Sequence, residues 1–189
     1  MDVDRIVRET QAWIHRVVVG LNLCPFASGV FDTGKIRYAV TPATAPEALA
    51  HALRKELLLL HRTAPEKTET SLLIHPCVLG NFYLYNDFLD TADAIIRKTG
   101  MEGIVQIAGF HPGYRFAGTH PDAPENYTNR SPYPMLHLLR ESSVARAIDS
   151  HRNADAIPDT NIETMRALGR EKAQQLLDGC HADAVATAL

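Results

Sequence analysis

Cysteine is scarce in this chain, and its count is odd. The 189 residues contain only three, Cys24, Cys77 and Cys180, too few and too scattered for a disulfide framework. Reduced thiols are typical of a reducing compartment, so the sequence predicts a cytoplasmic protein. A chain of this length can bury a core without disulfides or a structural metal, so the sequence requires no cofactor.

Long apolar runs and long basic runs are also absent. No apolar stretch approaches the roughly 20 residues of a membrane-spanning helix, and the start of the chain lacks the pattern of a secretory signal. The net charge is −3, whereas nucleic-acid binders usually carry a basic patch or stripe. We therefore expect neither a membrane nor a nucleic acid as a partner.

Hydrophobic periodicity predicts an α/β fold. Apolar residues recur with helical spacing over 3–21, after Thr44 and over 81–98, and short strand patterns occupy 36–40, 71–75 and 104–108. This alternation favours crossover connections and a small, mainly parallel sheet flanked by helices, with an added strand compatible near 114–116. We predict one helix-rich domain over 1–180, with a last helix at 160–178 and a frayed tail at 181–189.

The periodicity stops after Gly109. Residues 110–133 form a long segment rich in Pro, Gly, Asn and aromatic side chains. Loops longer than ~15 residues are usually functional or disordered, and the aromatic content argues against disorder. We predict a functional loop, followed by a helix that begins at Pro134 and pairs His137 with Glu141 one turn apart. The alternative is an ordered surface loop tied down by its own hydrogen bonds.

Several residues in and near this loop could perform acid–base or nucleophilic chemistry. His111 is the best candidate acid or base because imidazole titrates near neutrality, and Tyr114 could donate a hydrogen bond to a developing anion. His137 is a further catalytic candidate beside the loop. Cys24, held by Pro25, could be a nucleophile if its pKa is lowered, or else a buried structural cysteine.

The second half of the loop is suited to an anion. Arg130, and also Arg140, could clamp an anionic ligand, and Ser131 could cap the predicted helix, whose N-terminal amides would favour the same charge. Asn126 and Asn129 add polar groups that could bind the ligand.

Two other functions remain open. If the second and third strands are neighbours, His75, Cys77 and His111 lie on one edge of the sheet and could bind a divalent metal such as zinc or iron. Alternatively, the protein is a non-catalytic binding module in which the loop recognises a partner. A homodimer built on the first helix is compatible with each of these hypotheses about function.

Three motifs resemble a known bacterial family. They are Asn-Leu-Cys-Pro-Phe-Ala at 22–27, Phe-His-Pro-x-Tyr-x-Phe-Ala-Gly at 110–118, and Glu-Asn-Tyr-Thr-Asn-Arg-Ser-Pro-Tyr-Pro-Met-Leu-His-Leu-Leu-Arg-Glu at 125–141. They are similar to the domain of unknown function numbered 1415. The resemblance implies a stand-alone bacterial protein without an assigned activity. It points, without giving roles, to the signature positions Cys24, His111, Tyr114, Asn126, Asn129, Arg130, His137 and Arg140.

The leading hypothesis is therefore a small enzyme acting on an anionic small molecule. In it His111 moves a proton, Tyr114 stabilises charge and Cys24 is the nucleophile. Arg130 holds the anion, together with Arg140. The ligand would lie at the carboxyl ends of the strands, under the 110–133 loop.

Overall fold

A four-stranded sheet forms the centre of the molecule, in the order β1-β2-β4-β3. The computed structural model describes residues 1–186. Its strands are β1 (Ile36–Val40), β2 (Thr70–Ile74), β3 (Val105–Phe110) and β4 (Met135–Arg140). The helices are α1 (Val3–Trp13), α2 (Ala27–Asp32), α3 (Pro46–Arg62), α4 (Phe82–Lys98), α5 (Glu141–Ser150), α6 (Ile157–Leu168) and α7 (Arg170–Ala186). A π-helical segment, η1 (Ile14–Val19), continues α1, and two short 3-10 helices, η2 (Pro124–Thr128) and η3 (Ala154–Ala156), lie in the connections.

The α/β class and the single domain are confirmed, but the sheet is mixed and not mainly parallel. Strand β1 pairs with β2 in parallel, while β4 lies antiparallel to both β2 and β3. Two helical crossovers, α3 and α4, allow β1, β2 and β3 to run in one direction. The 111–134 segment instead begins and ends at the same end of the strands, so β4 runs antiparallel to the other three.

Residues 135–140 form a strand, so the predicted helix beginning at Pro134 is wrong there. Their sequence, Met-Leu-His-Leu-Leu-Arg, is a short and largely apolar run whose periodicity does not separate a strand from a helix. Tertiary pairing decides, since β4 hydrogen-bonds to a strand on each side. Pro134 precedes the strand, where no ladder bond is lost. His137 and Glu141 therefore lie on a strand and at the start of α5, and no helical pair forms.

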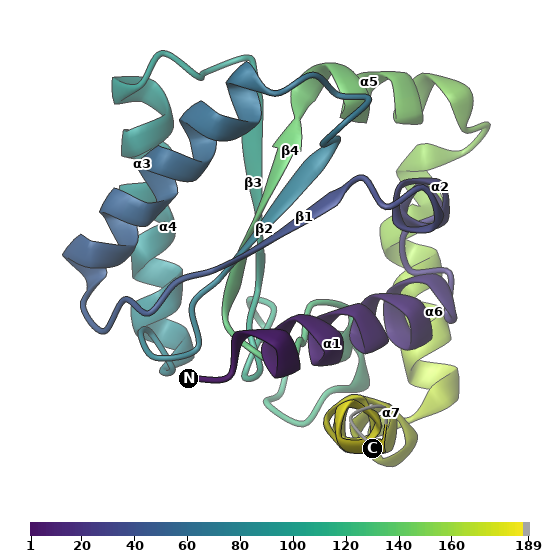
Figure 1. Cartoon of the computed structure of the whole chain (residues 1–189). Coiled ribbons are helices and arrows are strands. Elements are labelled where there is room, and N and C mark those ends of the chain that lie inside the picture. The colour runs from purple at the N-terminus through teal and green to yellow at the C-terminus, as the bar shows by residue number, and fades with distance from the viewer. Residues whose placement is uncertain (187–189) are drawn as a thin grey trace.

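Helices cover both faces of the sheet, as Figure 1 shows. On one face α3 and α4 pack through a leucine-rich core that includes Leu53, Leu57, Leu136 and Leu138. On the other face α1 and the C-terminal helices enclose a second core around Trp13, Met135 and Met165. Alternation along β4 explains the division, because Leu136 and Leu138 point to one face and Met135 and His137 to the other.

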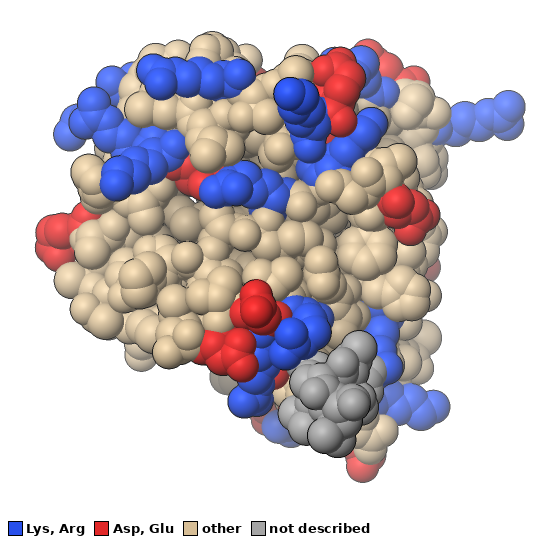
Figure 2. All heavy atoms as spheres, in the orientation of Figure 1, with Lys and Arg blue, Asp and Glu red and all other residues tan. Residues whose placement is uncertain are grey.

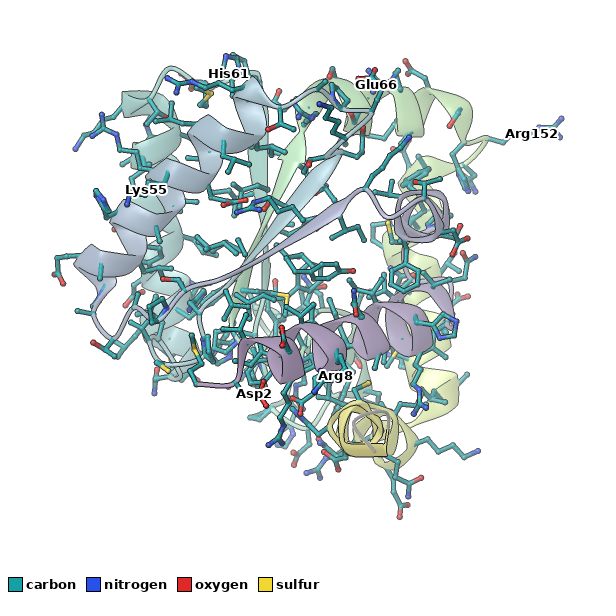
Figure 3. All side chains as sticks on the ribbon, in the orientation of Figure 1. Asp2, Arg8, Lys55, His61, Glu66 and Arg152 are labelled. Carbon is teal, nitrogen blue, oxygen red and sulfur yellow. The ribbon has the colours of Figure 1, made fainter. Side chains whose placement is uncertain are left out.

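Helix α3 shows how the sequence builds one of these layers. Leu49, Leu53, Leu57 and Leu60 are fully buried against the sheet, as expected for one apolar stripe at helical spacing. Lys55 points away from the sheet (Figure 3). Figure 2 shows basic side chains gathered over this outer side, and mixed charges near the start of α1. Charge of one sign therefore does not dominate the face in view.

The first helix begins where its sequence predicts, whereas the predicted last helix is interrupted. The Asp2 carboxylate caps α1 by accepting a hydrogen bond from the Arg5 backbone N–H at 2.9 Å, as expected for an acidic N-cap. The predicted last helix is two helices, because Gly169 at φ +80° separates α6 from α7. Helix α7 extends to Ala186, and residues 187–189 of the predicted frayed tail lie outside the described residues. Among residues 1–186, no helix is long and apolar enough to cross a membrane.

Candidate functional site

The 111–134 loop is ordered by hydrogen bonds that it makes to itself. Asn126 is fully buried and uses both ends of its amide. Its Oδ1 accepts hydrogen bonds from the Phe116 backbone N–H at 3.0 Å and the Thr119 hydroxyl at 2.8 Å, and its Nδ2 donates to the His120 carbonyl at 2.9 Å. Asn126 therefore holds the loop in its conformation, as expected for a buried amide whose hydrogen-bonding groups are satisfied.

The other polar residues assigned to the anion also bond to the backbone. Arg130 donates to the carbonyls of Tyr114 at 3.2 Å and Pro121 at 2.7 Å, and stacks on the Tyr127 ring at 4.3 Å. Asn129 donates to the Gly109 carbonyl at 3.2 Å, and the Ser131 hydroxyl donates to the Tyr133 carbonyl at 2.7 Å. Since no helix begins at Pro134, the helix terminus predicted to attract an anion is absent there.

His111 is 2% exposed, and both of its ring nitrogens have backbone partners. Nδ1 accepts from the Gly113 N–H at 2.9 Å, and Nε2 lies 3.0 Å from the Leu79 carbonyl, to which it donates. This is the neutral Nε2–H tautomer, and burial lowers the pKa of His111. The ring joins the loop after β3 to the loop after β2. Tyr114 packs beside it between Phe82 and Phe116, with its pKa raised by burial.

The predicted metal ligands do not assemble. Strand β4 separates β2 from β3, so His75 and His111 do not end neighbouring strands. The two rings instead pack on Tyr85, with centroid distances of 5.8 Å and 5.0 Å, while Cys77 is exposed. Within residues 1–186 no group of three or more His, Cys, Asp or Glu side chains is arranged to hold a metal ion.

A cavity of about 420 Å³ lies between the sheet and the helices that cover its second face. Its floor comes from the side chains of all four strands on that face. Its roof comes from α1, η1, α2 and α5, together with the segment before α2. The lining is mostly apolar and includes Trp13, Ile14, Val18, Phe26, Val30, Ile36, Leu72, Phe110, Leu139, Val144 and Ala147.

His137 and Thr70 form a hydrogen-bonded pair on the cavity floor. They lie on adjacent strands, since His137 pairs with Leu72 and Thr70 with Leu139. The Thr70 Oγ1 is 2.7 Å from His137 Nε2 and donates to the Leu138 carbonyl at 2.6 Å. Burial lowers the pKa of His137 to about 4, so the imidazole is neutral at neutral pH.

Two more of the predicted site residues line this cavity. Cys24 is partly buried, and that burial raises the pKa of its thiol, so the thiolate expected of a nucleophile is disfavoured. Arg140 contributes to the wall, but its Nη2 donates to the carbonyls of Leu60, Thr63 and Thr68 near the end of α3. The guanidinium therefore lies on the opposite face of the sheet and supports α3.

The structure thus divides the predicted residues into two groups. Cys24, His137 and Arg140 line a common cavity, although the Nη2 of Arg140 is directed to the end of α3. The other predicted residues, His111, Tyr114, Asn126, Asn129, Arg130 and Ser131, belong to the loop and its supports. The two regions meet where Trp13 donates to the Arg130 carbonyl at 2.9 Å and packs edge-on against Phe110 at 5.1 Å. Sequence reasoning missed Thr70 and Gln106, because only the pairing of β4 brings them to the same floor.

A protein-family model matches most of the chain. The model of DUF1415, described as a protein of unknown function, matches residues 5–175. The chain belongs to the DUF1415 family. The DUF1415 match spans all four strands, the 111–134 loop and every residue named above as lining the cavity. No curated protein and no solved structure matches the chain.

Proposed function

We propose that the protein binds a small, largely apolar molecule in the cavity between the sheet and the helices α1, α2 and α5. The observation that carries this proposal is the cavity itself, about 420 Å³ in volume and lined mainly by aliphatic and aromatic side chains. Ligand pockets of proteins usually measure roughly 300–1,000 Å³ and combine an apolar lining with a few polar groups. Here those groups include His137, Thr70, Gln106 and Ser143.

The position of the cavity supports the same proposal. The cavity opens to solvent and its lining is mostly apolar, so the fold leaves apolar surface there that a ligand can cover. Its walls come from segments far apart in the chain, so the cavity exists only in the folded protein. Binding an apolar ligand there would remove that lining from water and stabilise the fold.

The enzyme centred on His111 stays a prediction with less geometric support. Both ring nitrogens of His111 bind backbone groups, and Arg130 is engaged by carbonyls and by the Tyr127 ring. Neither residue lines the cavity. Recognition of a partner by the loop likewise stays a prediction, since the bonds made by Asn126 account for its order.

A neutral fluorophore tests the proposal. Prodan, which has no hydrogen-bond donor and whose emission shifts to the blue in apolar surroundings, should bind the wild-type protein saturably with one site. In Ala147→Leu the larger side chain enters the cavity from α5, so the affinity should fall by at least about tenfold, as expected for a blocked apolar site.

Ala145→Leu is the matched control. Ala145 lies on the same helix but is exposed, so the same substitution should leave Prodan binding within about twofold of wild type. Absence of saturable binding by the wild type, or equal loss in the two variants, would overturn the proposal.

A further inference from the structure

One hydrogen-bonding atom on the cavity floor, Nδ1 of His137, has no hydrogen-bond partner within the described residues 1–186. His137 Nε2 is engaged by Thr70, but within residues 1–186 no group donates to or accepts from Nδ1. Nδ1 is also not among the polar atoms that the fold seals away from solvent, and the ring lines the cavity. Nδ1 is therefore a polar contact that the cavity floor offers to a ligand, beside the amide of Gln106.

The bonds of Thr70 decide which ring nitrogen of His137 carries the proton. The Thr70 Oγ1 lies 2.6 Å from the Leu138 carbonyl oxygen, and two oxygen atoms approach this closely only with a proton between them. A hydroxyl has one proton, so Thr70 must accept the hydrogen bond from His137. Nε2 is then the protonated nitrogen, and Nδ1 is an unprotonated acceptor.

The charged groups around the cavity do not favour an anion beside His137. The guanidinium of Arg140 is directed to the end of α3 on the opposite face. Glu69 lies at the wall as a partly buried carboxylate, 3.8 Å from Arg146. Cys24 has its thiol pKa raised by burial, and the neutral state of His137 adds no positive charge. A buried anion without a counter-charge is strongly disfavoured.

We propose that the cavity selects an uncharged ligand that has an apolar body and one hydroxyl or N–H group, which donates a hydrogen bond to His137 Nδ1. This inference rests on the proposed function and names the chemical class of its ligand. It replaces the anionic ligand expected from the loop arginines with a neutral donor. Discrimination arises because a ligand without a donor leaves Nδ1 unsatisfied in a largely apolar site.

Three probes of similar shape test this selectivity. Para-butylphenol carries a donor, para-butylanisole replaces the hydroxyl with a methyl ether, and para-butylbenzoate is an anion at neutral pH. Competition with Prodan should place the phenol about tenfold tighter than the anisole, as expected for one hydrogen bond to an acceptor that the bound ligand covers. The benzoate should bind at least about a hundredfold more weakly than the phenol.

His137→Phe removes the acceptor and keeps a ring of similar size. In this variant the phenol and the anisole, each titrated directly by calorimetry, should bind within about twofold of each other. Nitrogen NMR of the wild-type imidazole provides a test without mutation. Nδ1 should have the resonance of an unprotonated nitrogen, and it should move when the phenol binds but not when the anisole binds.

The outcomes separate the two proposals. If Prodan binds and is blocked by Ala147→Leu, but the three probes compete equally or the benzoate is preferred, the neutral-donor inference is wrong and the proposed function stands. A protonated Nδ1 in the unliganded wild-type protein would also overturn the inference. If Prodan does not bind at all, the cavity is not a binding site and both proposals fail.

Discussion

His75 is a fully buried imidazole that the fold holds in the neutral state. Its Nδ1 lies 3.1 Å from the Val78 carbonyl, to which it donates, and its ring stacks on Tyr85. Nε2 is buried without a hydrogen-bond partner in the structure. Burial lowers the pKa of His75 from 6.5 to about 4, because the charged ring would lose its hydration.

This pKa shift predicts a loss of stability in mild acid. Between pH 6.5 and about 4 the unfolded chain binds a proton at His75 that the folded protein does not. The neutral His75 therefore contributes up to roughly 3 kcal/mol to the free energy of unfolding. This contribution is complete above pH 6.5 and is lost as the pH falls toward 4. His75→Asn keeps a donor for the Val78 carbonyl and does not titrate. Its free energy of unfolding should therefore depend less steeply on pH than that of the wild type.

Urea unfolding at several pH values measures the difference. His137 has a similarly lowered pKa and remains in the variant, so part of the acid dependence should persist. His51→Asn is the matched control, because His51 is exposed on α3, and its curve should follow that of the wild type. Identical slopes for wild type and His75→Asn between pH 6.5 and 4 would refute this assignment.

At the scale of single elements, two glycines illustrate how backbone conformation ends or weakens a helix. Gly169 has φ +80° and ψ 156°, a conformation that essentially only glycine adopts without strain, and it stands between α6 and α7. Gly29 lies inside α2 with no positive φ and open space around the position of a Cβ. The same substitution should therefore have opposite effects at the two positions.

Gly169→Ala should destabilise the protein by about 1–3 kcal/mol, because alanine is strained at this φ and ψ. Gly29→Ala should stabilise it by about 0.5–1 kcal/mol, because alanine is the better helix former and loses less conformational freedom on folding. Thermal and urea unfolding of both variants provide the comparison. If Gly169→Ala stabilised the protein instead, alanine would be free of strain at this φ and ψ, and the prediction would be wrong.

At the scale of the whole molecule, Glu9 joins three distant parts of the chain. Its carboxylate is fully buried. It accepts hydrogen bonds from Arg5 on α1 and His181 on α7, both at 2.7 Å, and from the Tyr133 hydroxyl beside β4. Burial by itself would raise the pKa of Glu9, but the three donors outweigh it and lower the pKa. The network therefore ties both ends of the described chain to the centre of the fold.

Glu9→Gln should destabilise the protein by about 2–4 kcal/mol. The side chain of glutamine has an N–H donor where one oxygen of the carboxylate accepts, so at least one of the three donors loses its acceptor. It also carries no charge, so the ion pair with Arg5 is lost. Glu163 is exposed on α6, so Glu163→Gln is the control and should change the free energy of unfolding by less than about 0.5 kcal/mol. Hydrogen exchange should show faster opening of α7 in Glu9→Gln, and unchanged protection of α7 would contradict the network's role.

Hydrophobic periodicity and turn residues predict most of the helices and strands, but few of the residues that line the cavity. The sequence predicts a strand at 36–40 and β1 lies there, because a five-residue run rich in β-branched and aromatic residues with turn signals on both sides favours a strand. The sequence also singles out Cys24 and His137, and both line the cavity. The cavity itself could not be predicted, since Thr70, Gln106 and His137 become neighbours only through the register of β2, β4 and β3.

The sequence by itself determined the α/β class, the amphipathic helices and the presence of a long ordered loop, because periodicity and turn chemistry act over a few residues. Tertiary structure alone decided that residues 135–140 are a central antiparallel strand. A largely apolar run of six residues suits a helix or a strand, and pairing on both edges selects the strand. That choice puts His137 on the cavity floor and directs Arg140 to α3.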